Sequence, residues 1–361
     1  MEEMAEQQNQ LSSEPQKRKR IEWIDVAKFL GIVLVFVAHG VYLDEPTLFR
    51  SLYRGIIYTF HMPLFFILSM ITTSLSDSKE TYIKKTKKRA VHLLIPFAIM
   101  WVIYTFVDIF YLKANAEDIN WWIQNINRLF GVEYPEVLAA GPAWFLMALF
   151  VGQSIFDFLH LVLKKDSYLF IVVCILTLIG VALGFVPIKF PFTLDMTMSS
   201  LVFFYFGYKL KSFDFEKNQF RRFMFFLAIW VITLLLTFPD FHNPTYYEVW
   251  YRRYPLFPIC IFCAISGTMV YLYLVKWFCK IPYLYKPFAF LGRWTLIMVL
   301  VHSLDQAYFG YWFNFFPERF HLTDYLGGAI GLGMSVIIIF IIILIKKWLK
   351  NKHQTTSDKT A

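Results

Sequence analysis

The segment Lys28–Gly40 reads KFLGIVLVFVAHG and decides the class of the protein. Between its lysine and its histidine lie ten uncharged, almost wholly apolar residues. The surrounding apolar block of about twenty residues has the length that a helix needs to cross roughly 30 Å of hydrocarbon. A helix that faces lipid gains nothing from the lysine or the histidine, so both residues need a separate explanation.

The composition of the whole chain is that of a membrane protein. Of the 361 residues, 58% are hydrophobic, 20% are aromatic and only 17% are charged, which is less charge than a soluble domain carries. The apolar residues fall into long blocks, which predict an all-α, polytopic membrane helix bundle with ten transmembrane helices. The expected spans are 24–43, 55–75, 91–112, 143–163, 168–186, 192–211, 221–238, 255–275, 288–309 and 326–345.

The net charge of +9 suggests nucleic acid as a partner, but the basic residues lie in short loops, where membrane topology explains them. Because lysine and arginine are concentrated in alternate loops and in the tails, both termini of this integral cell-membrane protein are predicted to be cytoplasmic. Residues 1–20 are expected to form a disordered basic tail, 21–347 the transmembrane domain and 348–361 a second tail. The first apolar block has no small-residue cleavage site, so no cleavable signal peptide is expected.

The cysteines do not indicate metal or redox chemistry. Cys260 and Cys263 form a C-x-x-C pair, but it lies inside an apolar helix, which favours packing. The sequence also has no zinc-ligand spacing, no phosphate-binding glycine loop and no internal repeat, so no metal is expected.

The first span carries three ionisable residues. Asp25 and Lys28 are three residues apart and are expected to pair at the cytoplasmic end. Lys28 and His39 are eleven residues apart, which places them within roughly 20° on one helix face and about 16 Å apart along the axis. A membrane protein without catalytic activity could also use them, Lys28 to reach lipid phosphate and His39 to bond a neighbouring helix.

The second span contains FHMPLFFILSM from Phe60 to Met70. This span enters from the outer side, so His61 is expected at a depth similar to that of His39, where the two imidazoles can meet. Pro63 removes a backbone donor and can open the helix. The alternative is that His61 stabilises the end of the loop at the membrane surface.

The cytoplasmic loop that follows contains KKTKKRAVHLLIP, with six basic residues between Lys79 and Arg89. Topology and anionic lipid explain part of this charge. A second interpretation is that the loop binds a phosphate-bearing cytoplasmic ligand.

Polar and aromatic residues recur at the expected outer ends of later spans. Trp144 begins span four and suits a membrane-interface belt, and Asp195 begins span six. In span nine, His302 and Asp305 are three residues apart, so the carboxylate can orient the ring, or the two can simply satisfy each other.

Two loop segments are also distinctive. The loop 239–255 combines many aromatic residues with Arg252 and Arg253, which suits either a sugar ligand or contact with the membrane surface. The stretch 119–132 is expected to be an amphipathic helix at the interface.

Four of these stretches, in chain order, resemble the acyltransferase 3 family of integral-membrane acyltransferases, from about Arg20 to Lys347. IDVAKFLGIVLVFVAHG resembles the family's first helix, in which a basic residue precedes a histidine by eleven positions. FHMPLFFILSM resembles its second helix, RAVHLLIPF its basic R-x-x-R-L-x-x-P motif and LGRWTLIMVLVHSL its late helix ending in histidine. AWFLMALF and VFFYFGYKL are weaker matches.

The chain departs from the family pattern at three positions. Lys28 replaces the usual first-helix arginine, His92 the second arginine of the loop motif and Met70 a glycine. Lysine is a point charge that cannot fork onto phosphate as arginine does. A lysine in the first helix is similar to a branch that includes fucose 4-O-acetylases and the membrane proteins of polysaccharide-adhesin operons.

The resemblance implies transfer of an acyl group, usually acetyl from acetyl-CoA, to a sugar hydroxyl of a cell-surface or exported glycan. The expected partners are therefore acyl-CoA, a carbohydrate or lipid-linked glycan, membrane lipid and the polysaccharide-synthesis machinery. His39 would act as general base or carry the acyl group. His61 and His302, the latter oriented by Asp305, would hold groups in place or stabilise the oxyanion.

The remaining site residues fall into two sets. Those expected to bind the donor are Asp25, Lys28, Lys85, Lys88, Arg89 and His92. Those expected to bind the acceptor are Trp144, Asp195, Arg252 and Arg253.

Two other classes of protein stay open. A transporter that exports or flips a polysaccharide is expected to have inverted repeats with paired broken helices, and the sequence shows no such repeat. A non-catalytic relative that acts in a complex is disfavoured because His39 is retained. Consumption of a thioester distinguishes the enzyme from the exporter.

Overall fold

The computed structural model describes residues 20–39, 48–110, 117–130, 143–238, 240, 244–304, 329 and 332–348. Within these ranges the regular elements are helices, and one isolated antiparallel bridge joins Glu248 and Arg253. Six of the described helices are long and apolar enough to cross a membrane, or seven if a bent pair forms one span. The predicted helical membrane bundle is therefore confirmed, whereas the count of ten spans and the side of the termini stay predictions.

Most of the helices follow the expected apolar blocks, but the basic stretch from Lys79 to Arg89, predicted as a loop, forms the first part of a helix. Their bounds are α2 Glu22–His39, α3 Leu48–Tyr58, α4 His61–Thr72, α5 Lys79–Phe110, α6 Ile119–Phe130, α7 Trp144–Val162, α8 Asp166–Leu183, η2 Pro191–Thr193, α9 Leu194–Ser199, α10 Leu201–Leu210, α11 Gln219–Thr237, α12 Ile259–Phe278 and α13 Tyr285–Gly292. Two further helices are Thr295–Leu304 and 332–348.

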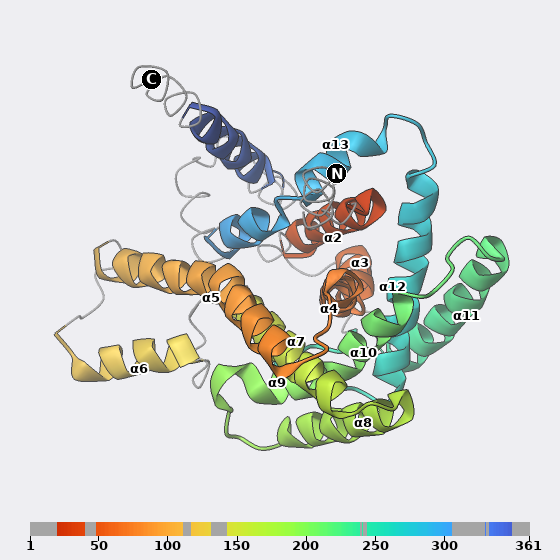
Figure 1. Ribbon diagram of the computed structural model, residues 1–361, viewed down its shortest axis with the longest axis horizontal. Helices are drawn as coiled ribbons and strands as arrows, with labels where there is room; N and C mark the ends of the chain where they lie inside the picture. Colours follow the sequence, from red (N-terminus) through yellow and green to blue (C-terminus); the bar gives the residue numbers. More distant parts are fainter. Residues whose placement is uncertain are drawn as a thin grey trace, which may run out of the picture.

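Helix α4 lies at the centre of the bundle. It packs against α2, α3, α7, α10 and α12, and Figure 1 shows it surrounded by helices from both halves of the chain. Its apolar side chains, including Leu64, Phe66 and Ile67, are fully buried. In contrast, α11 exposes Phe225, Ile232 and other large apolar side chains, as a helix on the lipid-facing surface does.

The second expected span corresponds to one membrane-length segment, Ser51–Thr72, with a two-residue turn at Thr59 and Phe60 between α3 and α4. Pro63 accounts for the position of this break. In a continuous helix the residue at 63 would donate its N–H to the carbonyl of Thr59, and proline has no N–H to donate. The proline therefore lies in the first turn of α4, where no such bond is needed.

The sixth and ninth expected spans are not continuous helices. The sixth is divided into η2, α9 and α10, and the ninth bends by 70° between α13 and Thr295–Leu304. Broken helices are tolerated at membrane depth where protein surrounds the freed backbone groups.

Helix α13 approaches the backbone of α2 very closely at Gly292. A Cβ atom at this position would lie 1.8 Å from the carbonyl oxygen of Asp25. On the other side of α2, the Tyr271 hydroxyl of α12 donates a 2.7 Å hydrogen bond to the carbonyl of Ala27. The N-terminal half of α2 is thus fixed between α12 and α13.

We predict that Gly292→Ala destabilises the protein by at least about 1–3 kcal/mol, because the added methyl group meets backbone that cannot move aside. Gly333→Ala is the matched control, since a Cβ there meets nothing within 4 Å. The melting temperatures of the purified variants in detergent test this. Equal melting temperatures for the two variants would contradict the close approach of α13 to α2.

Candidate active site

Three histidines from three helices meet in the bundle. His39 is the last residue of α2, His61 is the first residue of α4, and His302 lies in the helix Thr295–Leu304. The ring centroid of His39 is 5.1 Å from that of His302 and 6.3 Å from that of His61. The His39 ring is therefore directed into the bundle and not toward lipid.

Tyr58 completes what we call the histidine cluster, which comprises His39, His61, His302 and Tyr58. Tyr58 is the last residue of α3. Its hydroxyl lies 2.9 Å from Nδ1 and 3.3 Å from Nε2 of His39. Its ring centroid lies 4.6 Å from that of His61. The break between α3 and α4 thus places a hydroxyl and an imidazole, from consecutive helices, beside the end of α2.

The histidine cluster holds polar atoms that lack partners. His302 and His61 are 2% and 4% exposed. Three of their ring nitrogens have no hydrogen-bond partner in the described part of the chain: Nδ1 and Nε2 of His302, and Nδ1 of His61. Buried polar groups of this kind are costly unless a ligand or water satisfies them. Asp305, the expected partner of His302, lies outside the described residues.

At the other end of α2, Asp25 has a partner that was not predicted. Asp25 pairs with Arg20, whose Nε lies 2.7 Å from Oδ2. The segment before α2 brings this guanidinium to the same carboxylate and so competes with the lysine. Lys28 is partly buried, eleven residues before His39 on one continuous helix.

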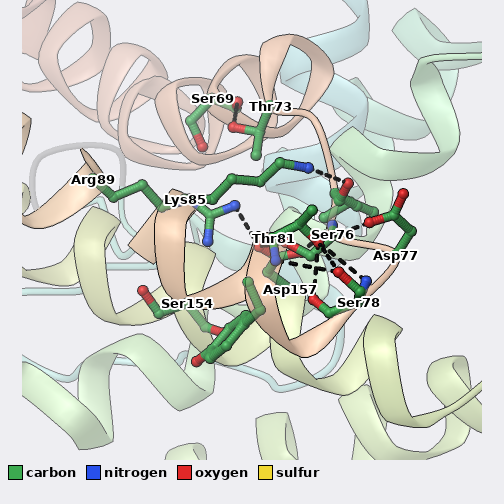
Figure 2. A network of polar contacts seen from close by, with 12 residues as sticks. Ser69, Thr73, Ser76, Asp77, Ser78, Thr81, Lys85, Arg89, Ser154 and Asp157 are labelled. Carbon is green, nitrogen blue, oxygen red and sulfur yellow. Dashed lines mark hydrogen bonds and ion pairs between the residues drawn. The ribbon is translucent and has the colours of Figure 1, made fainter. Parts of the chain in front are cut away.

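The basic segment of α5 is partly occupied by contacts within the protein. Arg89 Nη2 lies 2.6 Å from Oδ2 of Asp157 on α7, and the Arg89 and Asp157 side chains are 10% and 0% exposed. The same carboxylate accepts bonds from the backbone N–H and the hydroxyl of Ser76, at 2.6 and 2.9 Å. We call Asp157, Arg89 and Ser76 the Asp157 network; Figure 2 shows it between α5, α7 and the loop after α4.

Lysines fix the same loop. Lys85 donates a 2.6 Å bond to the carbonyl of Leu75, and Lys211 donates to the carbonyl of Thr73. Among the residues expected to bind the donor, Lys85 and Arg89 therefore have structural partners, whereas Lys88 and His92 have exposed side chains on α5.

Residues predicted to bind the acceptor gather near the start of α7. The rings of Trp144 and Trp250 lie 5.5 Å apart, and Lys189 Nζ lies 6.0 Å from the Trp250 ring. Burial, and then the positive charge of Arg252, lower the pKa of Lys189 to about 7. Lys189 is therefore close to both Trp250 and Arg252.

The structure pairs Asp195 with Arg252, which were predicted as separate ligand contacts. Arg252 Nη1 lies 3.1 Å from Asp195 Oδ2, and both side chains are buried. Arg252 also donates to the carbonyl of Ile188, whereas Oδ1 of Asp195 has no partner within the described residues. Arg253 is exposed, 3.7 Å from Glu248. We call Trp144, Lys189, Asp195, Trp250 and Arg252 the tryptophan cluster.

The sequence reasoning missed Tyr58 and Asp157. Tyr58 precedes His61 by three residues, a spacing that would have placed both on one helix face. Asp157 lies inside the expected span 143–163, where an ionisable residue is itself a signal, but the sequence does not identify its partners, which lie 68 and 81 residues away. No group of three or more His, Cys, Asp or Glu side chains within the described ranges is arranged to hold a metal ion.

Comparison with protein families supports the resemblance. The profile of the acyltransferase domain of the acyltransferase 3 family matches residues 21–345. No curated protein matches the chain. Since the match covers most of the sequence, the chain belongs to this family of membrane acyltransferases.

We predict that Asp157→Ala destabilises the protein by about 3–5 kcal/mol, because it leaves the Arg89 charge buried and unpaired. The control is Asp166→Ala, which removes a 3.1 Å pair with Lys209 in which both side chains are about half exposed. That surface pair contributes at most about 1 kcal/mol. Thermal unfolding in detergent compares the two variants, and a similar small effect of both would show that the Asp157 network is not a buried anchor.

Proposed function

We propose that this acyltransferase moves an acyl group, acetyl by expectation, from cytoplasmic acyl-CoA to a hydroxyl group of a cell-surface or exported glycan. The observation that carries the proposal is the meeting of His39, His61, His302 and Tyr58 inside an apolar bundle. Ionisable side chains at such a depth are expensive and usually serve a function.

His39 is the proposed general base. It takes the proton of the acceptor hydroxyl while the hydroxyl oxygen attacks the thioester carbon. When the carbon–sulfur bond breaks, the protonated His39 gives the proton to the sulfur, and CoA leaves as the thiol. In the alternative path, His39 first carries the acyl group. The Tyr58 hydroxyl, 2.9 Å from Nδ1, fixes the orientation of the ring in either path.

His61 and His302 are proposed to stabilise the oxyanion. Their ring nitrogens without partners supply N–H donors for a negative oxygen that forms beside His39. These donors are held by α4 and by the helix Thr295–Leu304, so they need no rearrangement when the charge develops. Asp305 keeps its proposed role in orienting His302.

The donor is proposed to lie along α2 and α4. Lys28 is about 16 Å from His39 along α2, and α4 separates His61 from the loop of the Asp157 network by roughly 18 Å. An elongated molecule with phosphates at one end and a thioester at the other, such as acyl-CoA, fits this arrangement. Its phosphates would meet the cytoplasmic set formed by Asp25, Lys28, Lys85, Lys88, Arg89 and His92.

The acceptor is proposed to bind at the tryptophan cluster, together with the exposed Arg253. Trp144 and Trp250 offer ring faces for a sugar, and Asp195 offers a free acceptor oxygen for a hydroxyl group. The similarity of Lys28 to the fucose 4-O-acetylase and polysaccharide-adhesin branch supports a glycan, made by separate polysaccharide-synthesis enzymes.

One observation favours the alternative, a polysaccharide exporter. The segments 191–210 and 285–304 are broken helices, which transporters use to build central binding sites. An exporter, however, releases no CoA from a thioester. Release of free CoA thiol by proteoliposomes supplied with acetyl-CoA therefore separates the two functions.

We predict that His39→Ala lowers thioester consumption by about 100-fold or more, because a positioned base contributes at least that much. His160→Ala, which changes a histidine of α7 outside the histidine cluster, is the matched control and keeps wild-type activity. The assay follows free CoA thiol together with ester signals on the glycan. A normally folded His39→Ala protein that still acylates the glycan would refute the central role of His39.

We also predict that Tyr58→Phe lowers kcat by about 3- to 10-fold, the effect of one lost orienting hydrogen bond. The phenyl ring keeps the packing against His61, so the KM for acyl-CoA stays unchanged. Steady-state kinetics in proteoliposomes separate the two constants. An unchanged kcat would mean that the tyrosine does not position His39.

A further inference from the structure

The loop between α8 and η2 exposes large apolar side chains although its backbone is irregular. Residues 184–190 read GFVPIKF, and Phe185 and Ile188 are 82% and 64% exposed. Irregular backbone does not face the hydrocarbon core of a bilayer, because its N–H and C=O groups would lack partners there. The hydrocarbon core therefore does not cover these side chains, and exposed apolar patches of this kind mark sites of interaction.

The exposed apolar residues continue onto α6, at the edge of the bundle in Figure 1. The ring of Phe192 in η2 is half exposed and lies 5.5 Å from the ring of Phe130 in α6. The exposed apolar residues of α6 recur at spacings of four, three and four, so they form one stripe. They are Ile119, Ile123, Ile126 and Phe130.

Contacts with α5 fix the direction of this stripe. Asn125 lies on another face of α6 and is buried. Its backbone carbonyl accepts a 2.9 Å bond from Trp101 Nε1, and its side-chain amide donates a 3.0 Å bond to the Thr105 hydroxyl. The stripe is therefore held facing outward. We call the stripe, together with Phe185, Ile188 and Phe192, the apolar surface.

A cation and the tryptophan cluster border the apolar surface. The Ile188 carbonyl accepts a 3.0 Å bond from Arg252, which joins the loop to the tryptophan cluster. Lys189 follows directly, with its Nζ 6.0 Å from the Trp250 ring, and Trp250 lies 5.5 Å from Trp144. Apolar side chains, a cation and ring faces thus follow one another along one path.

The charge at Lys189 suits an anionic group. Burial and the positive charge of Arg252 lower the pKa of Lys189 to about 7, although Asp195 acts in the opposite direction. An anion beside Nζ would stabilise the ammonium form, because it offsets the repulsion by Arg252. A phosphate offers such a charge together with several acceptor oxygens.

We propose that the apolar surface binds the hydrocarbon chain of a lipid-linked glycan, with the linking phosphate at Lys189 and the sugar at the tryptophan cluster. That this lipid is the acyl acceptor rests on the function proposed above. Chain, phosphate and sugar follow one another in such a lipid in the order in which the protein presents their binding groups. An ordinary phospholipid has no sugar for the tryptophan rings.

Photo-cross-linking tests the surface directly. The probe is dodecyl phosphate with a photoreactive diazirine on its chain, in nanodiscs of phosphatidylcholine, and mass spectrometry locates the label. We expect label on residues 185–192 and on α6 that excess dodecyl phosphate removes and dodecanol does not. Equal competition by phosphatidylglycerol would contradict the proposal, because the surface then binds membrane lipid. Label spread over all exposed helices without competition would also overturn it.

Variants with a matched control measure the two contacts. Ile188→Ala combined with Phe192→Ala weakens probe binding by about tenfold or more, the range for two large apolar contacts. The same change at exposed side chains of α11, Ile232→Ala with Phe225→Ala, leaves binding unchanged. Lys189→Gln weakens binding by about tenfold or more, whereas Lys189→Arg keeps the charge and the affinity. Equal affinity of Lys189→Gln and the wild type would show that the phosphate does not bind there.

The acceptor class is tested with polar lipids from cells that lack this protein. Proteoliposomes with acetyl-CoA receive either the lipid-linked glycans or the same glycans released from lipid by mild acid. We expect a KM at least about tenfold higher for the released glycans at similar kcat, because the chain contributes uniform binding. Equal KM values would overturn the proposal.

The two experiments also separate this site from the proposed function. Cross-linking uses no CoA, so a wild type that binds the probe but consumes no thioester would refute the proposed function and leave the apolar surface standing. A wild type that acylates glycan but does not bind the probe would refute only the lipid site.

Discussion

Pro63 has no backbone N–H, and this missing donor accompanies the turn between α3 and α4 at the histidine cluster. The absent bond to the carbonyl of Thr59 separates α3 from α4 and places Tyr58 and His61 on either side of the break. Tyr58 and His61 are three residues apart, so an unbroken helix would also place them on one face. The turn between them sets how the hydroxyl and the imidazole lie beside the end of α2.

The rest of the bundle holds this arrangement in place. Helix α2 is fixed by the close approach of Gly292 and by the bond from Tyr271, and α4 is buried along its length. The loop after α4 is tied to α5 and α7 through Asp157. A rigid α4 therefore connects the histidine cluster at one end with the Asp157 network at the other. The proposed donor needs such a spacing, because its phosphates and its thioester lie at opposite ends of one long molecule.

Much of the fold was predictable because the length and apolar composition of membrane helices can be recognised in the sequence. The meeting of His39 and His61 followed from matched depths on consecutive antiparallel spans, which is local information. The partners of the charged residues could not be predicted from the sequence. Arg89 pairs with Asp157, 68 residues away, and Asp195 with Arg252, 57 residues away. Charge alone cannot distinguish a phosphate-binding arginine from one paired within the protein, and only tertiary packing supplies the difference.

In the proposed mechanism, the acyl group of a cytoplasmic thioester reaches the ring of His39. The most direct test is a cryo-electron microscopy structure with a non-hydrolysable thioether analogue of acetyl-CoA. We expect the acyl carbonyl to lie among His39, His61 and His302, with its oxygen about 3 Å from an imidazole nitrogen of His61 or His302. A bound analogue whose acyl end lies outside the histidine cluster would refute the proposed mechanism.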